Sequence, residues 1–269
     1  MLAGTGRSGL CHTFLMLIDT HCHLDFPDFS VDRAAVIERA RSQGVEQIVV
    51  PSVTVDNFQS VLDVCEGVPA LFPALGLHPC FTHESAAAIE QLGQVLTSHH
   101  PVAVGEIGLD FRPGQAPAEV QVPLFEQQLT LAREHDLPVL LHVVKAHDEV
   151  LKRLRQCQLP RGGIVHAFSG SEQQAREYAK LEFKLGFGGA FTHARARKLQ
   201  RLAAELPLQW LVLETDAPDM PLAGYQGERN EPARVAEVAQ QLASLRGVSL
   251  AQVAEQTCAN ARQILHLPQ

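Results

Sequence analysis

The sequence predicts a (β/α)8 barrel, in which eight parallel strands are surrounded by helices. Apolar, β-branched runs alternate with amphipathic stretches along the whole chain, which is the pattern of repeated β-α units. The chain has 269 residues, 46% of them hydrophobic, and so can build the large core that this fold needs. Acidic and histidine side chains also recur at the ends of the apolar runs, where such a barrel carries its functional groups.

Eight apolar runs are predicted to be strands. They cover Phe14–Asp19, Val45–Pro51, Ala70–Leu75, Val102–Glu106, Val139–His142, Gly163–His166, Phe183–Gly188 and Trp210–Glu214. Helical patterns lie between them, for example over Val31–Gln43, Glu119–His135 and Ala146–Cys157. Capping boxes are predicted at Ser171-x-x-Gln174 and Ser249-x-x-Gln252, because these side chains can satisfy free amides at a helix start. A doubly wound open sheet is the structural alternative, but it would not gather the ends of these strands at one place.

Residues 17–269 are predicted to form the barrel domain, and residues 1–16 an N-terminal extension of little structural consequence. A signal peptide after Arg7 is rejected, because no small-x-small cleavage site follows and Phe14–Ile18 fits the first strand. No apolar run approaches the roughly 20 residues of a membrane span. Six scattered cysteines without a C-x-x-C pair favour thiols that are at least partly buried in a reducing, cytoplasmic environment. They are Cys11, Cys22, Cys65, Cys80, Cys157 and Cys258.

The formal charge of −8 disfavours a protein that holds long duplex nucleic acid on a broad basic surface. It does not exclude a nuclease, since bound divalent cations supply local positive charge that the formal count omits. No obligate protein partner is evident from the sequence.

Two histidines follow the first predicted strand one residue apart. Because strand side chains alternate between faces, His21 and His23 point the same way and can bind one metal ion. Cys22 lies between them and, by the same alternation, faces away. With 13 histidines in the chain, one such pair carries little weight alone.

Further candidate ligands stand at the ends of other predicted strands. Glu106 ends the fourth, between glycines that leave room for its carboxylate to approach a metal, and bridging two cations would offset the cost of burying its charge. His142 and His166 end the fifth and sixth strands, and Asp216 follows the eighth. Asp216 could also accept a proton from an attacking water. The structural alternatives are a Glu that caps a helix, core histidines, and a purely structural Glu214.

These residues lie within motifs that together resemble the TatD family of metal-dependent deoxyribonucleases, and most closely its YjjV-like branch. The motifs are Asp19-Thr20-His21-Cys22-His23-Leu24-Asp25, Gly76-Leu77-His78-Pro79, Gly105-Glu106-Ile107-Gly108-Leu109-Asp110, Leu141-His142, His166-x-Phe168-Ser169-Gly170, Glu214-Thr215-Asp216-Ala217-Pro218 and Arg229-Asn230-Glu231-Pro232. The resemblance runs from about Leu17 to the C-terminus. It implies a barrel of the amidohydrolase superfamily, two divalent cations and hydrolysis of DNA phosphodiesters.

Matched residue by residue, the resemblance implies two overlapping ligand sets. The first cation would be held by His21, His23, Glu106 and Asp216, and the second by Glu106, His142 and His166. The ions could be Zn, Mn or Mg, and softness favours a transition ion for so many imidazoles. One departure concerns phosphate recognition, because Val144 stands where relatives usually carry an Arg, and Lys145 can replace only its charge. Candidate substrate contacts are His78, Arg112, Lys145, His193 and Arg229.

The sequence is therefore interpreted as a cytoplasmic, metal-dependent hydrolase of phosphodiester bonds, with DNA or another phosphodiester as its substrate and single-stranded DNA ends favoured. Glu106 and Asp216 are its candidate catalytic residues. One alternative is an amidohydrolase-superfamily enzyme acting on a cyclic amide, lactone or aminoacyl ester. Another is a metal-binding barrel without catalytic activity. The sequence does not define the metal, the cleavage polarity, a preference for DNA over RNA, or the oligomeric state.

Overall fold

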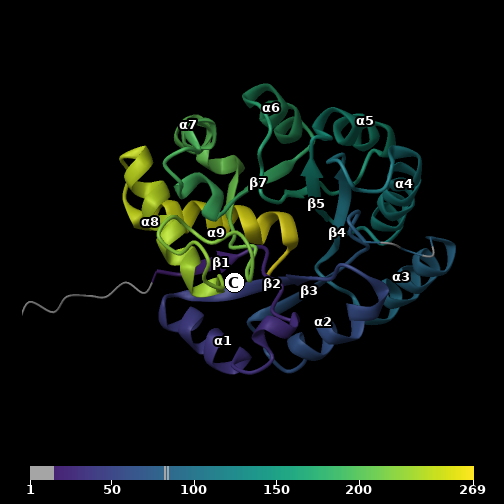
Figure 1. Ribbon diagram of the computed structural model, residues 1–269, viewed down its shortest axis with the longest axis horizontal. Helices are drawn as coiled ribbons and strands as arrows, with labels where there is room; N and C mark the ends of the chain where they lie inside the picture. The colour runs from purple at the N-terminus through teal and green to yellow at the C-terminus, as the bar shows by residue number, and fades with distance from the viewer. Residues whose placement is uncertain (1–14, 82, 84) are drawn as a thin grey trace, which may run out of the picture.

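Eight parallel strands follow one another around the barrel in the order in which they occur in the chain (Figure 1). The computed structural model describes residues 15–81, 83 and 85–269. The strands are β1 (Leu17–Asp19), β2 (Val45–Pro51), β3 (Leu71–Leu75), β4 (Ala103–Asp110), β5 (Val139–Val144), β6 (Gly163–Val165), β7 (Phe183–Phe187) and β8 (Leu211–Leu213). This arrangement confirms the predicted (β/α)8 barrel.

The first and last strands meet just beyond their carboxyl ends. The amide of Thr20 donates to the carbonyl of Leu213 at 3.0 Å, and the amide of Asp216 donates to the carbonyl of His21 at 2.9 Å. Cys22 and Ala217 form a parallel bridge. The segments that carry the first two histidines and Asp216 are thereby held side by side, although about 195 residues separate them in the chain.

Nine helices are found in the described part of the chain. They are α1 (Arg33–Ser42), α2 (Phe58–Cys65), α3 (Ser85–His99), α4 (Ala118–Glu134), α5 (His147–Cys157), α6 (Glu172–Lys180), α7 (Arg197–Glu205), α8 (Val235–Arg246) and α9 (Leu250–Leu265). The two predicted capping boxes are confirmed, because Ser171 and Ser249 accept from the amides of Gln174 and Gln252 at 3.1 and 3.2 Å. Among the described helices, none is long and apolar enough to cross a membrane.

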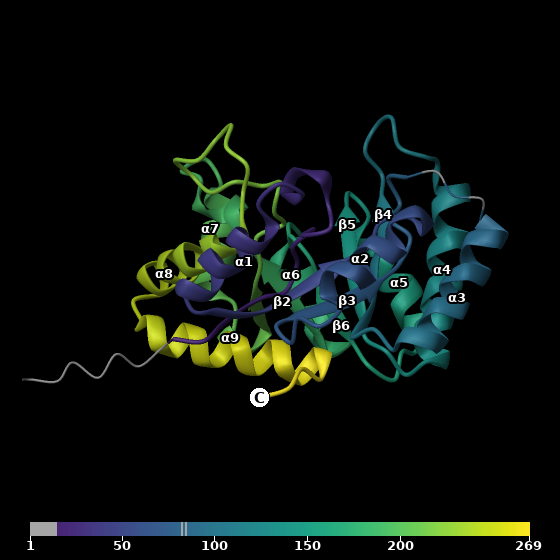
Figure 2. The same cartoon turned by 90° about the horizontal axis from the view of Figure 1, so that it is seen from below.

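Helix α9 covers the amino-terminal end of the barrel, opposite the long loops (Figure 2). Its Cys258, Ala261, Ile264 and Leu265 pack with the apolar side chains that fill the barrel. Those interior residues are Ile18, Val49, Ala74, Ala103, Leu140, Ile164 and Val212. Because apolar packing closes this end, polar chemistry is confined to the carboxyl ends of the strands.

Most predicted element bounds lie within one or two residues of those observed, but β4 is longer than expected. It extends to Asp110 because Gly108, Leu109 and Asp110 continue to pair with β5. A Cβ on Gly108, which has φ +146°, would collide with the backbone of His142, and one on Gly105 would lie 2.5 Å from the Cβ of Leu140. These glycines therefore let β4 approach β5. The sequence interpretation, in which they make room for a metal, is wrong.

Some expectations fall at the amino-terminal edge of the described chain. Phe14, Cys11 and residues 1–14 of the predicted extension lie outside the described residues. Of the extension, Leu15 and Met16 are described; Leu15 packs against the apolar core and the carbonyl of Met16 accepts from Cys258 Sγ at 3.2 Å. The division between an extension and a barrel domain at residue 17 stays a prediction.

His147 begins α5 in an apolar setting. Its ring packs edge-on against Phe168 and Tyr178, with centroids 5.4 and 5.8 Å apart. Nδ1 lies 3.2 Å from the Tyr178 hydroxyl, while Nε2 is buried without a hydrogen-bond partner in the described structure. Burial lowers the pKa of His147 to about 4, since a protonated ring would leave one N–H unsatisfied.

We expect His147 to make the fold sensitive to acid. Its stabilising neutral form is fully present above pH 6.5, the ordinary pKa, and is lost as the pH falls from 6.5 to about 4. The difference in unfolding free energy between the wild type and His147→Gln should change by roughly 3 kcal/mol over that interval. Histidine NMR titration, assigned with the same variant, checks the pKa directly. A value at or above 6.5 would contradict this account.

Candidate metal centre

Strand alternation brings several predicted ligands to the open end of the barrel. Leu140, Ile164 and Val212 face the interior. Side chains two positions further along a strand share the same face; here they are His142, His166 and Glu214. The sequence pattern thus accounts for the convergence of these residues above the apolar filling.

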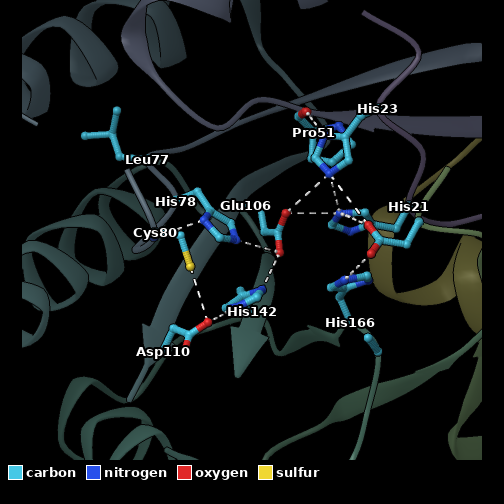
Figure 3. A network of polar contacts seen from close by, with 12 residues as sticks. His21, His23, Pro51, Leu77, His78, Cys80, Glu106, Asp110, His142 and His166 are labelled. Atoms are coloured by element: carbon cyan, nitrogen blue, oxygen red, sulfur yellow. Dashed lines mark hydrogen bonds and ion pairs between the residues drawn. The ribbon is translucent and has the colours of Figure 1, made fainter. Parts of the chain in front are cut away.

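Glu106 lies buried between two groups of histidines (Figure 3). Its Oε2 is 3.1 Å from His21 Nε2 and 3.6 Å from His23 Nε2. Its Oε1 is 3.1 Å from His142 Nδ1 and 3.4 Å from His78 Nε2. Each carboxylate oxygen therefore faces a different pair of imidazoles.

Asp216 completes the cluster on the side of His21. Its Oδ1 lies 3.7 Å from Nε2 of both His21 and His23, and its Oδ2 lies 3.6 Å from His166 Nε2. The rings of His21 and His166 stack with centroids 3.8 Å apart. All six residues expected to bind metal are thus brought to one end of the barrel.

Two triads in this cluster have ligand atoms within 4.8 Å of one another: His21, His23 and Asp216, and His21, Glu106 and His166. The set expected for a second cation is not among the triads found at this spacing in the described residues. His142 contacts Oε1 of Glu106, whereas His166 lies against His21 and Asp216. The assignment of Glu106, His142 and His166 to one ion stays a prediction.

The charges in the cluster suit divalent cations. Burial raises the pKa of Glu106, but the surrounding histidines lower it by more, to well below its ordinary value. The pKa of Asp216 also lies below its usual value, because His166, His21 and His23 outweigh burial. Burial, together with His21, lowers the pKa of His23 to about 4. Ionised carboxylates beside a neutral imidazole form a donor set that divalent cations bind, so the residues fit metal ions.

Three further groups lie behind the imidazoles. Asp110 Oδ2 accepts from His142 Nε2 at 3.0 Å, and the carbonyl of Pro51 lies 3.2 Å from His23 Nδ1. Glu214 Oε1 lies 3.1 Å from His166 Nδ1. The sequence assigns no role to Asp110, although it falls within the Glu106 motif.

Asp19 links the first and last strands of the barrel behind the site. It is fully buried and accepts from the Thr215 amide at 3.0 Å, the Thr215 hydroxyl at 2.6 Å and the His21 amide at 3.2 Å. Burial raises the pKa of Asp19 to about 8. These bonds position the loop after β1 against the loop after β8, and hence His21 against Asp216.

Cys80 is a site residue that the sequence interpretation misses. Its thiol donates to Asp110 Oδ2 at 3.2 Å, and it forms a third triad with His78 and His142. Burial raises the pKa of Cys80, but His142 and His78 lower it by more, to about 7. Only its position two residues after His78 could have indicated this placement. Cys22, by contrast, is wholly buried in the apolar core, away from the ligands as predicted.

A cavity of about 500 Å³ opens over the cluster. Its lining includes His23, Glu106, His142, His166 and Asp216. Two of the candidate substrate contacts, His78 and Arg112, also line it. The Arg112 guanidinium is held by Asp110, with Nη2 to Oδ2 at 2.5 Å and Nε to Oδ1 at 2.9 Å.

The other candidate substrate contacts are not among the described residues that line this cavity. Lys145 is exposed, and Val144 lines the cavity beside it. His193 Nε2 lies 3.0 Å from the Pro221 carbonyl. Arg229 pairs with Asp32 at 2.8 Å and lies over the Phe29 ring. Their roles in substrate binding stay predictions.

Comparisons with known proteins identify the family of this chain. The family model described as "TatD related DNase" matches residues 18–266. The "Uncharacterized metal-dependent hydrolase YjjV" of Escherichia coli is 44% identical over 254 residues, covering 93% of this chain and 98% of that protein. The "3'-5' ssDNA/RNA exonuclease TatD" of Erwinia tasmaniensis is 31% identical, covering 93% and 100%.

A solved structure shows the same architecture. The crystal structure of YjjV, described as a TatD homolog from Escherichia coli, superposes with a TM-score of 0.90 at 44% identity, covering 95% of this chain and 100% of that one. Family model, sequence and fold thus agree over nearly the whole chain. The chain belongs to the TatD-related DNase family of metal-dependent hydrolases.

Proposed function

We propose that this protein hydrolyses phosphodiester bonds with two divalent cations and removes nucleotides from the ends of single-stranded DNA. The observation that carries the proposal is the Glu106 carboxylate, whose two oxygens face different pairs of imidazoles at 3.1–3.6 Å. A carboxylate in this position is suited to bridge two ions. The name of the Erwinia relative, an exonuclease of single-stranded DNA and RNA, supports the nucleic-acid substrate.

The proposed ligands form two sets that share Glu106. His21, His23 and Asp216 would complete the first set, and His142 and His166 the second. Two divalent cations held there would supply Lewis acidity: they would bind phosphate oxygens, lower the pKa of a water and offset charge on the leaving alcohol. The donor atoms fit Zn, Mn or Mg, and the ion is left unnamed.

Asp216 is the proposed general base. Its side chain is 17% exposed, in contrast to the 3% of Glu106, and it lines the cavity. Its lowered pKa keeps it ionised near pH 7, so it can take the proton of a water that attacks the phosphorus. Glu106 also lines the cavity but is almost fully buried, and it acts as a ligand.

The cavity wall suits a nucleotide. Phe26 and Phe81 line it, and Phe81 is 45% exposed. Exposed aromatic faces stack with the bases of single strands, whereas duplex bases are already stacked on each other. Arg112 supplies a guanidinium at the same wall, although its pairing with Asp110 reduces the charge available to phosphate.

The presence of Glu106 on β4 argues against the main enzymatic alternative, an amidohydrolase-superfamily enzyme acting on a cyclic amide, lactone or aminoacyl ester. Superfamily members acting on cyclic amides often bridge two metals through a modified Lys on this strand, where this chain has Glu106. Comparing hydrolysis of bis(p-nitrophenyl) phosphate with that of dihydropyrimidine separates the two activities. A metal-binding barrel without activity would hydrolyse neither compound, nor a single-stranded oligonucleotide.

Replacing Glu106 or Asp216 by Ala should abolish turnover, because each change removes a proposed metal ligand. Asp216→Ala also removes the proposed general base. Loss of rate on a single-stranded oligonucleotide is the measurement, and circular dichroism checks that the barrel still folds. Asp219→Ala is the matched control, since this carboxylate lines the same cavity but belongs to no ligand triad. Retention of more than about a tenth of the wild-type rate in either variant, a barrier change below about 1.4 kcal/mol, would overturn the roles.

Chelation gives a separate prediction. We expect EDTA to remove activity, divalent ions to restore it, and elemental analysis of the purified protein to find about two divalent ions per chain. Near pH 7 Glu106 and Asp216 are ionised and His23 is neutral. Burial lowers the pKa of His142 and His166, but neighbouring carboxylates raise it by more, to well above the ordinary value, so ion binding at these two rings would displace protons. Activity that is indifferent to chelation would exclude the metal mechanism.

Asp110 is expected to position His142 for its ion. Groups behind a ligating histidine fix the ring orientation, and their loss costs about 10–100-fold in metal affinity or activity. Asp110→Asn should therefore weaken metal binding by about 10–100-fold in a chelator competition. Arg112→Gln is the control, because it breaks the ion pair with Asp110 but leaves the bond to His142. Equal metal affinity in both variants would contradict a positioning role for Asp110.

A further inference from the structure

A cluster of exposed basic residues stands beside the proposed site. Arg195, Arg197, Lys198 and Arg201, which we call the α7 basic patch, fall within seven residues at the start of α7, and no acidic residue occurs between His193 and Ala204. All four are exposed. The chain as a whole carries 22 Lys and Arg against 30 Asp and Glu, so the patch has the opposite sign to the net charge.

The α7 basic patch lacks acidic partners, unlike eight of the thirteen arginines that the structure describes outside it. Within the described residues, none of its four side chains lies at ion-pair distance from a carboxylate. Arginines elsewhere do form such pairs, namely Arg39, Arg112, Arg153, Arg155, Arg161, Arg176, Arg229 and Arg234. Four adjacent unpaired cations repel one another, and an anionic ligand would relieve that repulsion.

The α7 basic patch lies next to the cavity. In this fold the helix after a strand begins at the carboxyl end of that strand, so the start of α7 faces the functional end. Helix α9 closes the other end of the barrel (Figure 2). Lys198 Nζ donates to the carbonyl of Ser169 at 2.7 Å, and Ser169 lines the cavity, as does Leu199. Arg197 and Arg201 are four residues apart and share one face of the helix.

The cavity itself offers little free positive charge for a polyanion. Arg112 is the one Arg or Lys among the described residues that line it, and Asp110 neutralises it. Phosphates beyond the one at the reacting centre must therefore find cations outside the cavity. The α7 basic patch supplies them along one wall, and its short extent matches a single strand better than the broad basic surface that duplex binding uses.

We propose that the α7 basic patch binds the backbone phosphates of a single-stranded nucleic acid whose end occupies the cavity. This inference rests on the proposed function and extends it to the part of the substrate that is not cleaved. The patch is a positioning surface: it holds the strand while the ligands and Asp216 act on the terminal linkage. It contributes to binding of an oligonucleotide and not to hydrolysis of a small phosphodiester.

The test is a triple variant, Arg195→Gln, Arg197→Gln and Arg201→Gln, which keeps Lys198 and its bond to Ser169. Its matched control, Arg155→Gln, Arg176→Gln and Lys180→Gln, removes the same charge from α5 and α6. Steady-state kinetics of the metal-loaded proteins are compared on single-stranded dT12 and on bis(p-nitrophenyl) phosphate, at several salt concentrations. Fluorescence anisotropy with labelled dT12 measures binding independently of turnover.

We expect the triple variant to raise KM for dT12 about tenfold at low salt, with kcat and hydrolysis of the small substrate unchanged. The slope of log(kcat/KM) against the logarithm of the salt concentration should become less steep by about 2, since three contacts are removed and each single-strand phosphate contact contributes about 0.7. An effect on dT12 no larger than in the control variant would overturn the inference, as would a loss of binding to anionic lipid vesicles without a change for dT12.

The two proposals fail differently. If both phosphodiesters are hydrolysed and the triple variant behaves like the control, the inference is wrong and the proposed function stands. If the wild type hydrolyses neither compound in any metal, the proposed function is wrong. In that case anisotropy decides the inference, which survives only if the wild type binds dT12 and the triple variant binds it about tenfold more weakly.

Discussion

The buried carboxylate of Glu106 is the constraint on which the rest of the site depends. A charge that is 2% exposed above an apolar core is costly unless it is paired on several sides. Here each oxygen is enclosed by imidazoles, and those imidazoles come from the segments that follow β1 and β3 and from β5 itself. Removing one partner would leave the charge exposed to apolar surroundings. The buried charge of Glu106 is thus tolerated only because protonated or metal-bound histidines surround it, and the barrel strands hold those histidines in place.

The geometry around Glu106 is fixed by groups that do not face the cavity. Asp19 joins the loop after β1 to the loop after β8, and Asp110 and Glu214 hold two imidazoles from behind. Gly186 belongs to the same support, because a Cβ there would collide with the Glu214 carboxylate. Since the donors are held before any ion arrives, little conformational entropy remains to be lost on binding.

Much of this could be predicted from the sequence, because strand alternation is local. His142 and His166 are placed by parity with Leu140 and Ile164, and the number and order of the strands follow from the alternating pattern. Local patterns do not define the residues behind the ligands. The position of Asp110 depends on how far β4 continues alongside β5. The position of Cys80 depends on a loop whose path is set by its neighbours. The predicted role of the glycines around Glu106 is wrong for the same reason, because contacts between strands, which a local pattern does not show, determine where glycine is required.

An acidic protein that binds a polyanion must separate its charges in space. In the proposed mechanism the carboxylates of the site hold cations, and Asp219 adds another acidic group at the rim. A nucleic acid approaching this end therefore meets repulsion unless positive charge lies along its path. The α7 basic patch provides that charge on one wall only, so it favours a strand that enters from one side. Charge placement at the rim, rather than net charge, would then select a free single-stranded end over a continuous duplex.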